Sequence, residues 1–125
     1  DERLANAEKV GAGQVVKTIA LALDKPILLM TAGDVKIDNK KYKDFFKKKA
    51  KMLSADDTLT CTTHPVGGVC PFGLPVKIDI YADKSLIAYD TVIPAAGSRN
   101  SSVKIQRERL IEMTKAIIVD VTKSK

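Results

Sequence analysis

Residues 15–31 have the sequence V-V-K-T-I-A-L-A-L-D-K-P-I-L-L-M-T. The stretch contains two runs of apolar and β-branched residues with a D-K-P turn between them. Runs of this composition bounded by turn residues are typical of strands, and so short a connection favours an antiparallel hairpin. We therefore predict two strands, over residues 15–23 and 27–31, that pair with each other.

Lys17 lies inside the first predicted strand. Counting by two along a strand places it in one row with the larger side chains, which we expect to face the core. That row is Val15, Ile19, Leu21 and Leu23. Because an unpaired ammonium group is costly to bury, Lys17 must either reach solvent from the start of the strand or line a pocket. The pattern alone leaves both alternatives open.

The rest of the chain alternates short strands with short helices. Asp38 is a good N-cap for a helix over residues 39–49, with Tyr42, Phe45 and Phe46 on its packed face. Ser54 caps one or two further helical turns toward Thr60. We also predict helices at 3–10 and 106–114, a short turn or helix at 83–89, and strands at 77–82, 91–95 and 116–121. This order predicts a mixed α+β fold, with residues 1–125 as a single domain.

The composition limits the class of protein. The chain has 125 residues and 13.6 kDa, with 45% hydrophobic and 29% charged residues, ordinary values for a globular protein. Its longest apolar run is far shorter than the roughly 20 residues that cross a bilayer, so we expect no membrane segment. Cys61 and Cys70 provide no disulfide framework, which favours the cytoplasm. With His64 as the one histidine, we expect no metal site and no cofactor.

The positive charge is concentrated in residues 36–51. This segment has eight lysines against two acids, Asp38 and Asp44, and so carries the whole net charge of +6. Positive charge collected on one side is the pattern expected of a protein that binds a polyanion. The alternative is a solvated helix face that contributes only solubility.

A glycine- and proline-rich loop follows, H-P-V-G-G-V-C-P-F-G-L-P over residues 64–75. Such a loop cannot be helical, and its backbone N–H groups can converge on an anion or on a developing oxyanion. A tight connection between sheet elements is the other explanation. Cys70 and His64 also raise the hypothesis of a thiol hydrolase, although one rigid loop rarely orients both members of a nucleophile pair.

Three motifs together resemble the YbaK/EbsC family of aminoacyl-tRNA deacylases, which is related to the editing domain of bacterial prolyl-tRNA synthetases. The motifs are V-V-K-T at 15–18, the 64–73 part of the loop, and P-A-A-G-S-R-N-S at 94–101. The resemblance implies a curved, barrel-like mixed sheet flanked by short helices. It also implies an N-terminal strand and loop that we expect this chain to lack.

The family's activity is the metal-independent hydrolysis of the ester in mischarged tRNA. The resemblance gives the catalytic roles to Lys17, Gly67 and Gly68: Lys17 would bind the 3′-terminal adenosine or phosphates, and the loop closed by Pro71 would hold the ester carbonyl. It implies that the substrate is bound by Thr18, His64, Gly97, Ser98, Asn100 and Ser101. We expect the tRNA itself to meet Lys40, Lys41, Lys47, Lys48 and Lys49.

Two further expectations concern the edited amino acid and the binding partner. Many relatives have Ser where Ala95 stands, so the edited amino acid does not carry over from the family. The expected partner is the 3′ acceptor end of a mischarged tRNA, and tRNA(Pro) is the tRNA that we expect. The alternative is a non-catalytic adaptor of the same fold that binds tRNA or an aminoacyl-tRNA synthetase.

Overall fold

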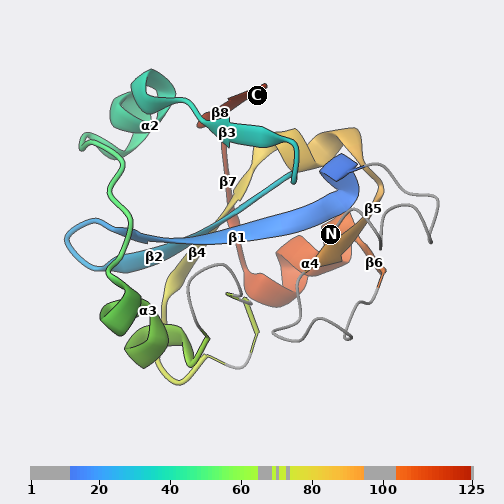
Figure 1. Ribbon diagram of the computed structural model, residues 1–125. Helices are drawn as coiled ribbons and strands as arrows, with labels where there is room; N and C mark the ends of the chain where they lie inside the picture. Colours follow the sequence, from blue (N-terminus) through green and yellow to red (C-terminus); the bar gives the residue numbers. More distant parts are fainter. Residues whose placement is uncertain (1–11, 65–68, 70, 73, 95–103, 125) are drawn as a thin grey trace.

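The predicted hairpin lies at the centre of the sheet (Figure 1). Strand β1 (Val15–Ala22) pairs antiparallel with β2 (Pro26–Thr31), with Lys17 opposite Thr31 and Leu21 opposite Ile27. The prediction from residues 15–31 is therefore confirmed. The computed structural model describes residues 12–64, 69, 71–72, 74–94 and 104–124.

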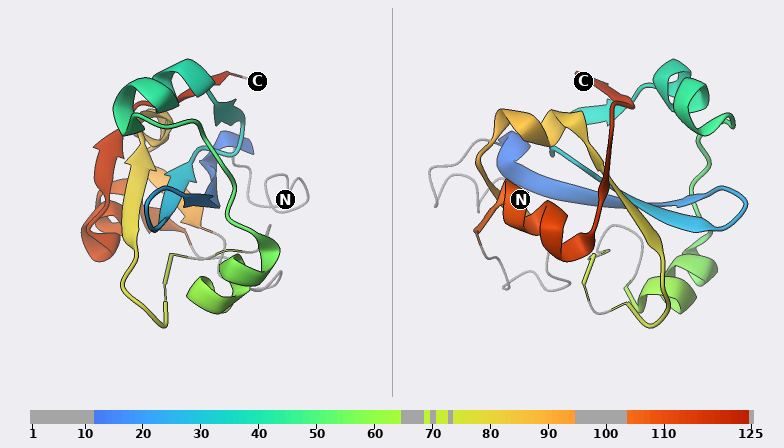
Figure 2. Two further views of the ribbon diagram at one scale, coloured as in Figure 1. Left: turned by 90° about the vertical axis from the view of Figure 1, so that its left-hand side faces the viewer. Right: turned by 180° about the vertical axis from the view of Figure 1, so that it is seen from behind.

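Further strands extend the hairpin on both sides. They are β3 (Val35–Ile37), β4 (Asp79–Asp83), β5 (Thr91–Pro94), β6 (Ile105–Gln106), β7 (Ile117–Val119) and β8 (Thr122–Ser124). Six strands form one sheet in the order β6-β5-β1-β2-β4-β7, and β3 pairs with β8 in a small second sheet. The β1–β5, β2–β4 and β4–β7 pairs are parallel. The larger sheet is curled, and helices lie around it (Figure 2).

Three α-helices and two 3₁₀ turns occur among the described residues. They are α2 (Asn39–Phe46), α3 (Ala55–Thr62), α4 (Arg107–Thr114), η1 (Ala12–Gln14) and η2 (Lys84–Ala88). The predicted mixed α+β fold is thus confirmed. The helix expected at residues 3–10 lies outside the described residues.

Both predicted helix caps are present. The Asp38 carboxylate accepts hydrogen bonds from the backbone N–H groups of Lys40 and Lys41, at 3.0 and 3.2 Å. Helix α2 ends earlier than predicted, at Phe46, because Lys47 adopts a left-handed conformation with φ 65°. The Ser54 hydroxyl accepts from the backbone N–H of Asp57, and α3 continues to Thr62, beyond the predicted end.

The two faces of the hairpin are both covered, which corrects the expectation of a single core face on β1. Val16, Ala20 and Leu28 belong to a core that also contains Leu110 of α4. Leu21 belongs to a second core on the opposite face, whose buried residues are Leu21, Ile27, Leu29, Tyr42, Val119 and Val121. The small side chains of β1 are buried deeply because the opposing layer packs closely against them.

Helix α2 packs on the second core through its aromatic side chains. Tyr42 is fully buried, and its ring centroid lies 4.5 Å from that of Phe46, which in turn lies 5.0 Å from the ring of Tyr81 on β4. Phe45 remains 46% exposed at the edge of this contact. The predicted packing face is therefore confirmed for Tyr42 and Phe46, whereas Phe45 is only partly covered.

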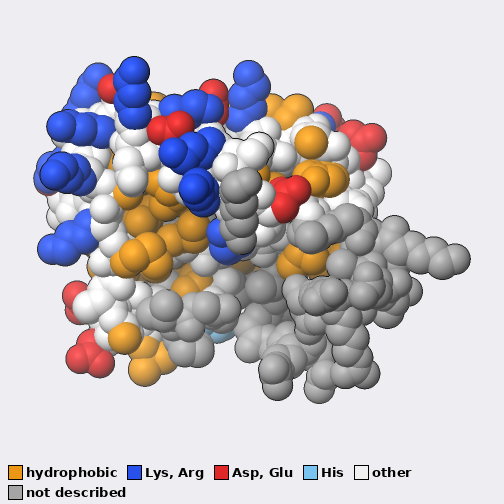
Figure 3. Space-filling model, turned by 45° about the horizontal axis from the view of Figure 1, so that its top comes forward, with side chains coloured by type: hydrophobic (Ala, Val, Ile, Leu, Met, Phe, Trp, Pro, Cys, Tyr) orange, Lys and Arg blue, Asp and Glu red, His pale blue; other side chains and the backbone are white. Residues whose placement is uncertain are grey.

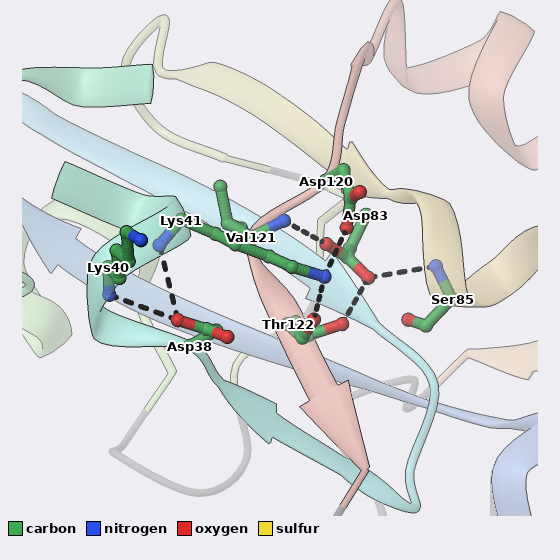
Figure 4. Close-up of polar contacts among 8 residues, drawn as sticks. All are labelled: Asp38, Lys40, Lys41, Asp83, Ser85, Asp120, Val121 and Thr122. Carbon is green, nitrogen blue, oxygen red and sulfur yellow. Dashed lines mark hydrogen bonds and ion pairs between the residues drawn. The ribbon is translucent and has the colours of Figure 1, made fainter. Parts of the chain in front are cut away.

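The strand predicted at residues 116–121 is shorter in the structure, where β7 covers only residues 117–119. Chain direction changes after β7, and the next residues form β8 against β3; the sequence analysis predicted neither of these two short strands. A buried carboxylate fixes this change of direction. Asp83 is 1% exposed and accepts from the backbone N–H of Val121 at 2.8 Å and from the hydroxyl of Thr122 at 2.6 Å (Figure 4).

Two more hydrogen bonds extend this cluster. Asp83 also accepts from the backbone N–H of Ser85 at the start of η2, at 2.8 Å. The carbonyl of Val121 accepts from the backbone N–H of Asp38, at 2.8 Å, just where α2 begins. Asp83 therefore connects β4, η2 and the C-terminal strand to the start of α2.

We expect Asp83→Asn to lower the free energy of unfolding by about 2 kcal/mol or more, because an amide NH₂ cannot accept the hydrogen bonds that the buried carboxylate accepts. Asp120→Asn is the matched control. Asp120 is exposed and pairs with Lys41 at 3.2 Å, so its loss should cost below about 1 kcal/mol. Urea unfolding of both variants measures the difference, and equal losses would contradict the role of Asp83.

Candidate active site at the open edge of β1

A pocket of about 180 Å³ lies along the middle of β1. Among the described residues, β5 pairs with β1 only at Val15 and Val16, so the edge of β1 is open from Lys17 onward. The pocket occupies this opening. Its lining residues are Lys17, Thr18, Ile19, Ala20, Met52, Thr58 and Val69.

The segment between α2 and α3 closes the far end of this edge. The backbone N–H of Leu53 donates to the carbonyl of Ala20 at 3.1 Å, and the N–H of Ala22 donates to the carbonyl of Lys51 at 2.8 Å. Met52 forms a bridge opposite Leu21 between these two hydrogen bonds. The pocket wall at Met52 is therefore fixed to the same strand that supplies Lys17 and Thr18.

Thr18 has the most unusual environment of the lining residues. It is 8% exposed, and its hydroxyl oxygen is buried without a hydrogen-bond partner among the described residues. Most buried hydroxyl groups in folded proteins have a partner, because leaving one unpaired is costly. Thr18 thus contributes to the wall of the pocket, while its hydroxyl oxygen is itself covered.

Lys17 lines the same pocket, which decides between the two alternatives that the sequence left open. Its side chain is half-buried, and its ammonium group donates to the carbonyl of Val35 at 3.0 Å. The contact joins β1 to the start of β3. Lys17 therefore lines the pocket while its ammonium group is held by the backbone at the start of β3.

The β2–β3 turn that receives Lys17 is itself held in place. The N–H of Gly33 donates to the carbonyl of Gly13 at 3.3 Å. A Cβ atom at Gly13 would lie 2.0 Å from the hydroxyl oxygen of Tyr89, so any other residue there would require the Tyr89 side chain to move. Burial, together with the neighbouring carboxylate of Asp34, raises the pKa of Tyr89. Tyr89 therefore stays protonated and can donate its hydrogen bond to Asp34.

Helix α3 contributes polar side chains to the pocket side of the molecule. Thr58 and Thr62 are both buried, and the Thr62 hydroxyl donates to the carbonyl of Thr58 at 2.6 Å. The backbone N–H of His64 donates to the Thr62 hydroxyl at 3.1 Å, so His64 begins the glycine- and proline-rich loop from the end of α3. His64 is half-buried and is not among the lining residues of the pocket.

The described part of that loop returns to the pocket. Val69 is 3% exposed and lines the pocket with Lys17 and Thr18, so this described residue of the loop lies beside the lysine strand. The remaining expected site residues lie outside the described residues. They are Gly67, Gly68, Gly97, Ser98, Asn100 and Ser101, as is Cys70 of the thiol hypothesis.

The sequence analysis named Lys17 and Thr18 as site residues but not the five other lining residues, Ile19, Ala20, Met52, Thr58 and Val69. For Thr58 a signal was available, because Thr58 and Thr62 are four residues apart and so lie on one face of a helix. Two threonines on one face of a helix indicate that this face lies against polar groups. Met52 and Val69 carry no comparable signal, because their positions depend on long-range contacts.

The predicted tRNA-binding lysines are all exposed but differ in their partners. The Lys41 ammonium group lies 3.2 Å from the Asp120 carboxylate, and Lys48 forms a close ion pair with Asp24. The hydrogen bond and charge of Lys48 lower the pKa of Asp24. Lys40, Lys47 and Lys49 make no ion pair with any described residue. Lysine side chains gather over α2 in Figure 3.

The described residues contain neither a metal-binding cluster nor a membrane-spanning helix. No group of three His, Cys, Asp or Glu side chains comes together there in the way that a metal ion requires. No helix in the described part of the chain has both the length and the apolar character needed to cross a membrane.

Comparison with protein families identifies the chain. The sequence profile of the aminoacyl-tRNA editing domain matches residues 2–113. The chain belongs to this family. Lys17, Thr18, Thr58 and Val69 therefore form a pocket inside an editing domain.

Individual relatives agree with this assignment. The chain is 41% identical over 125 residues to the uncharacterized protein YwhH of Bacillus subtilis (strain 168), covering 98% of this chain and 80% of the relative. It is 27% identical over 97 residues to the proline–tRNA ligase of Latilactobacillus sakei subsp. sakei (strain 23K), covering 76% of this chain but only 17% of that much longer enzyme.

A solved structure has the same fold. It belongs to a protein proposed to be a trans-editing enzyme for prolyl tRNA synthetase, and it superimposes with a TM-score of 0.89 at 22% identity, covering 98% of this chain and 79% of that chain. The predicted fold type, a curled sheet of the editing-domain kind, is therefore confirmed.

We expect Thr18→Val to leave the editing domain as stable as the wild type or slightly more stable, because the substitution removes a buried hydroxyl that has no partner and keeps the side-chain shape. Thr62→Val is the matched control. The Thr62 hydroxyl donates one hydrogen bond to Thr58 and accepts another from the N–H of His64, so its removal should lower the unfolding free energy by about 1 kcal/mol or more. Thermal unfolding measures both, and a clear loss for Thr18→Val would show that its hydroxyl is paired.

Proposed function

We propose that the protein is a trans-acting aminoacyl-tRNA deacylase, which hydrolyses the ester between a wrong amino acid and the 3′ end of a tRNA. Residues 1–125 would act as one editing domain in the cytoplasm, where charged tRNA is used. One observation carries the proposal: Lys17 and Thr18 line a single pocket with Val69 of the glycine- and proline-rich loop.

The chemistry needs little beyond such a pocket. Water adds to the ester carbonyl carbon, and the bond from that carbon to the ribose oxygen then breaks. The ribose oxygen takes up a proton, so the products are the free amino acid and a tRNA with its 3′-terminal hydroxyl restored. An aminoacyl ester is already activated, so positioning and stabilisation of the oxyanion can suffice without a covalent nucleophile.

Each residue of the site has a role in this proposal. Lys17 would bind the 3′-terminal adenosine or its phosphate and so position the ester. Backbone N–H groups in the loop from Gly67 to Pro71 would stabilise the negative charge that develops on the carbonyl oxygen. Thr18 would hydrogen-bond the substrate, and His64 with the 97–101 loop would complete the binding site.

The pocket also bears on the substrate. A volume of about 180 Å³ lined by Ala20, Met52 and Val69 suits a small amino-acid side chain. Because the identity of that side chain does not follow from the family, a panel of mischarged tRNAs is the first experiment. We expect turnover with tRNA(Pro) bearing Ala or Cys, in the presence of EDTA.

Lys17→Met should lower single-turnover deacylation on the order of a hundredfold, because the ester would no longer be held in position for attack by water. The same substitution removes the hydrogen bond to Val35, so we also expect a loss of about 1 to 2 kcal/mol in unfolding free energy. A loss of this size leaves most domains folded at 25 °C.

Lys36→Met serves as the control, since Lys36 is an exposed residue next to Val35 on β3. It should change neither rate nor stability. A Lys17→Met rate within about threefold of the wild type would contradict the catalytic assignment, since single contacts of this kind contribute far more. Tight tRNA binding by the wild type without any turnover across the panel would favour the adaptor instead.

A further inference from the structure

A second hollow lies beside α2, separate from the pocket on β1. Its volume is about 490 Å³, and lysine side chains dominate its walls. The lining residues are Asn39, Lys40, Lys43, Lys49 and Ala50. Lys40 and Lys43 come from the exposed side of the helix, and Lys49 comes from the segment that follows it.

The three lysines of this hollow are available to a ligand. Their ammonium groups make no ion pair with any described residue, whereas the neighbouring Lys41 and Lys48 are engaged with Asp120 and Asp24. The charge of the basic segment is thus divided by the fold. Part of it is paired with acidic residues of the chain, and three of the lysines without an ion pair to a described residue line one concave place.

The hollow is close to the pocket along a fixed piece of chain. Ala50 lines the hollow and Met52 lines the pocket, so only about 7 Å of extended chain separates these two walls. Hydrogen bonds from the N–H of Ala22 to the carbonyl of Lys51 and from the N–H of Leu53 to the carbonyl of Ala20 hold that piece against β1. The hollow and the pocket therefore lie at a fixed distance and direction from each other, and a ligand that spans both must match that spacing.

We propose that this hollow, formed by Lys40, Lys43 and Lys49, binds backbone phosphates of the tRNA acceptor stem while the 3′ end lies in the pocket on β1. The inference rests on the proposed function for the position of the 3′ end. Phosphate is the ligand that fits, because ammonium groups bind phosphate as point charges and tRNA presents successive phosphates along one strand. Asn39 adds an amide that can donate to a phosphate oxygen.

The acidic start of α3 supports this direction for the strand. Asp56 and Asp57 are exposed in the first turn of α3, on the far side of the 47–53 segment from α2 (Figure 1). Carboxylates repel a phosphate backbone, so they disfavour a path over α3. The strand is expected to leave the pocket toward α2.

The test compares two double variants with the same change in charge. Lys43→Glu/Lys49→Glu reverses the charge of two lysines that line the hollow. Lys77→Glu/Lys84→Glu reverses the charge of two exposed lysines on other parts of the chain. Binding of uncharged tRNA is measured by titration over a range of salt concentrations, which requires no deacylation. Thermal unfolding of both variants checks that the fold is intact.

We expect the hollow variant to bind tRNA at least about tenfold more weakly, with the slope of log affinity against log salt reduced by about 2, as for two lost phosphate contacts. The control should keep its slope. Equal changes in the two variants would overturn the proposal, because they would mean that net charge alone attracts the tRNA.

A second measurement separates this inference from the proposed function. Deacylation of an amino acid esterified to a short 3′-terminal C-C-A oligonucleotide, which lacks the stem, should proceed at the wild-type rate in the hollow variant. A rate loss on that substrate would overturn the assignment of the hollow to the stem. If the wild type hydrolyses neither substrate, the proposed function fails, while the tRNA titration still decides whether the hollow binds RNA.

Discussion

The buried carboxylate of Asp83 is the constraint on which the arrangement of the two candidate sites depends. Its hydrogen bonds fix Val121 and Thr122, and the carbonyl of Val121 in turn holds the first turn of α2 through the N–H of Asp38. A carboxylate buried with three donors resists displacement, because any shift leaves it or a donor unpaired. These hydrogen bonds from the end of β4, together with the packing of Tyr42 and Phe46, hold the basic helix over the sheet.

Strand β1 explains how a small sheet can also hold a site. Its first residues pair with β5 and its last residues with the 51–53 segment, which leaves Lys17 to Ile19 as an open length of edge. Open edges normally attract another strand, and natural proteins cover them with loops or helices. Here Thr58 and Val69 cover the edge at a distance that leaves a pocket instead of a packed contact. The site is thus the space that remains where strand pairing is interrupted.

Local patterns predicted the local structure well and the long-range structure poorly. The hairpin, both helix caps and the aromatic face of α2 depend on neighbouring residues, so the sequence contains the information. The strands β3 and β8 are three residues long and exist only because they pair across the chain, which no local pattern reports. The burial of Val16 and Ala20 was missed for the same reason. Counting large side chains assumes one covered face, whereas packing of α4 and α2 covers both.

The site shows the same division. Lys17 and Thr18 could be named from their motif, and the return of the loop to the strand could be expected, but Met52 reaches the pocket only through the pairing of the 51–53 segment with β1. Charge is affected in the same way, since the sequence gives eight lysines in residues 36–51 without distinguishing those that the fold neutralises. Ion pairs with Asp24 and Asp120 remove Lys48 and Lys41 from the attractive surface. A polyanion therefore meets mainly the lysines that have no ion pair with a described residue. The position of these lysines, more than the net charge of +6, determines the direction from which a nucleic acid can approach.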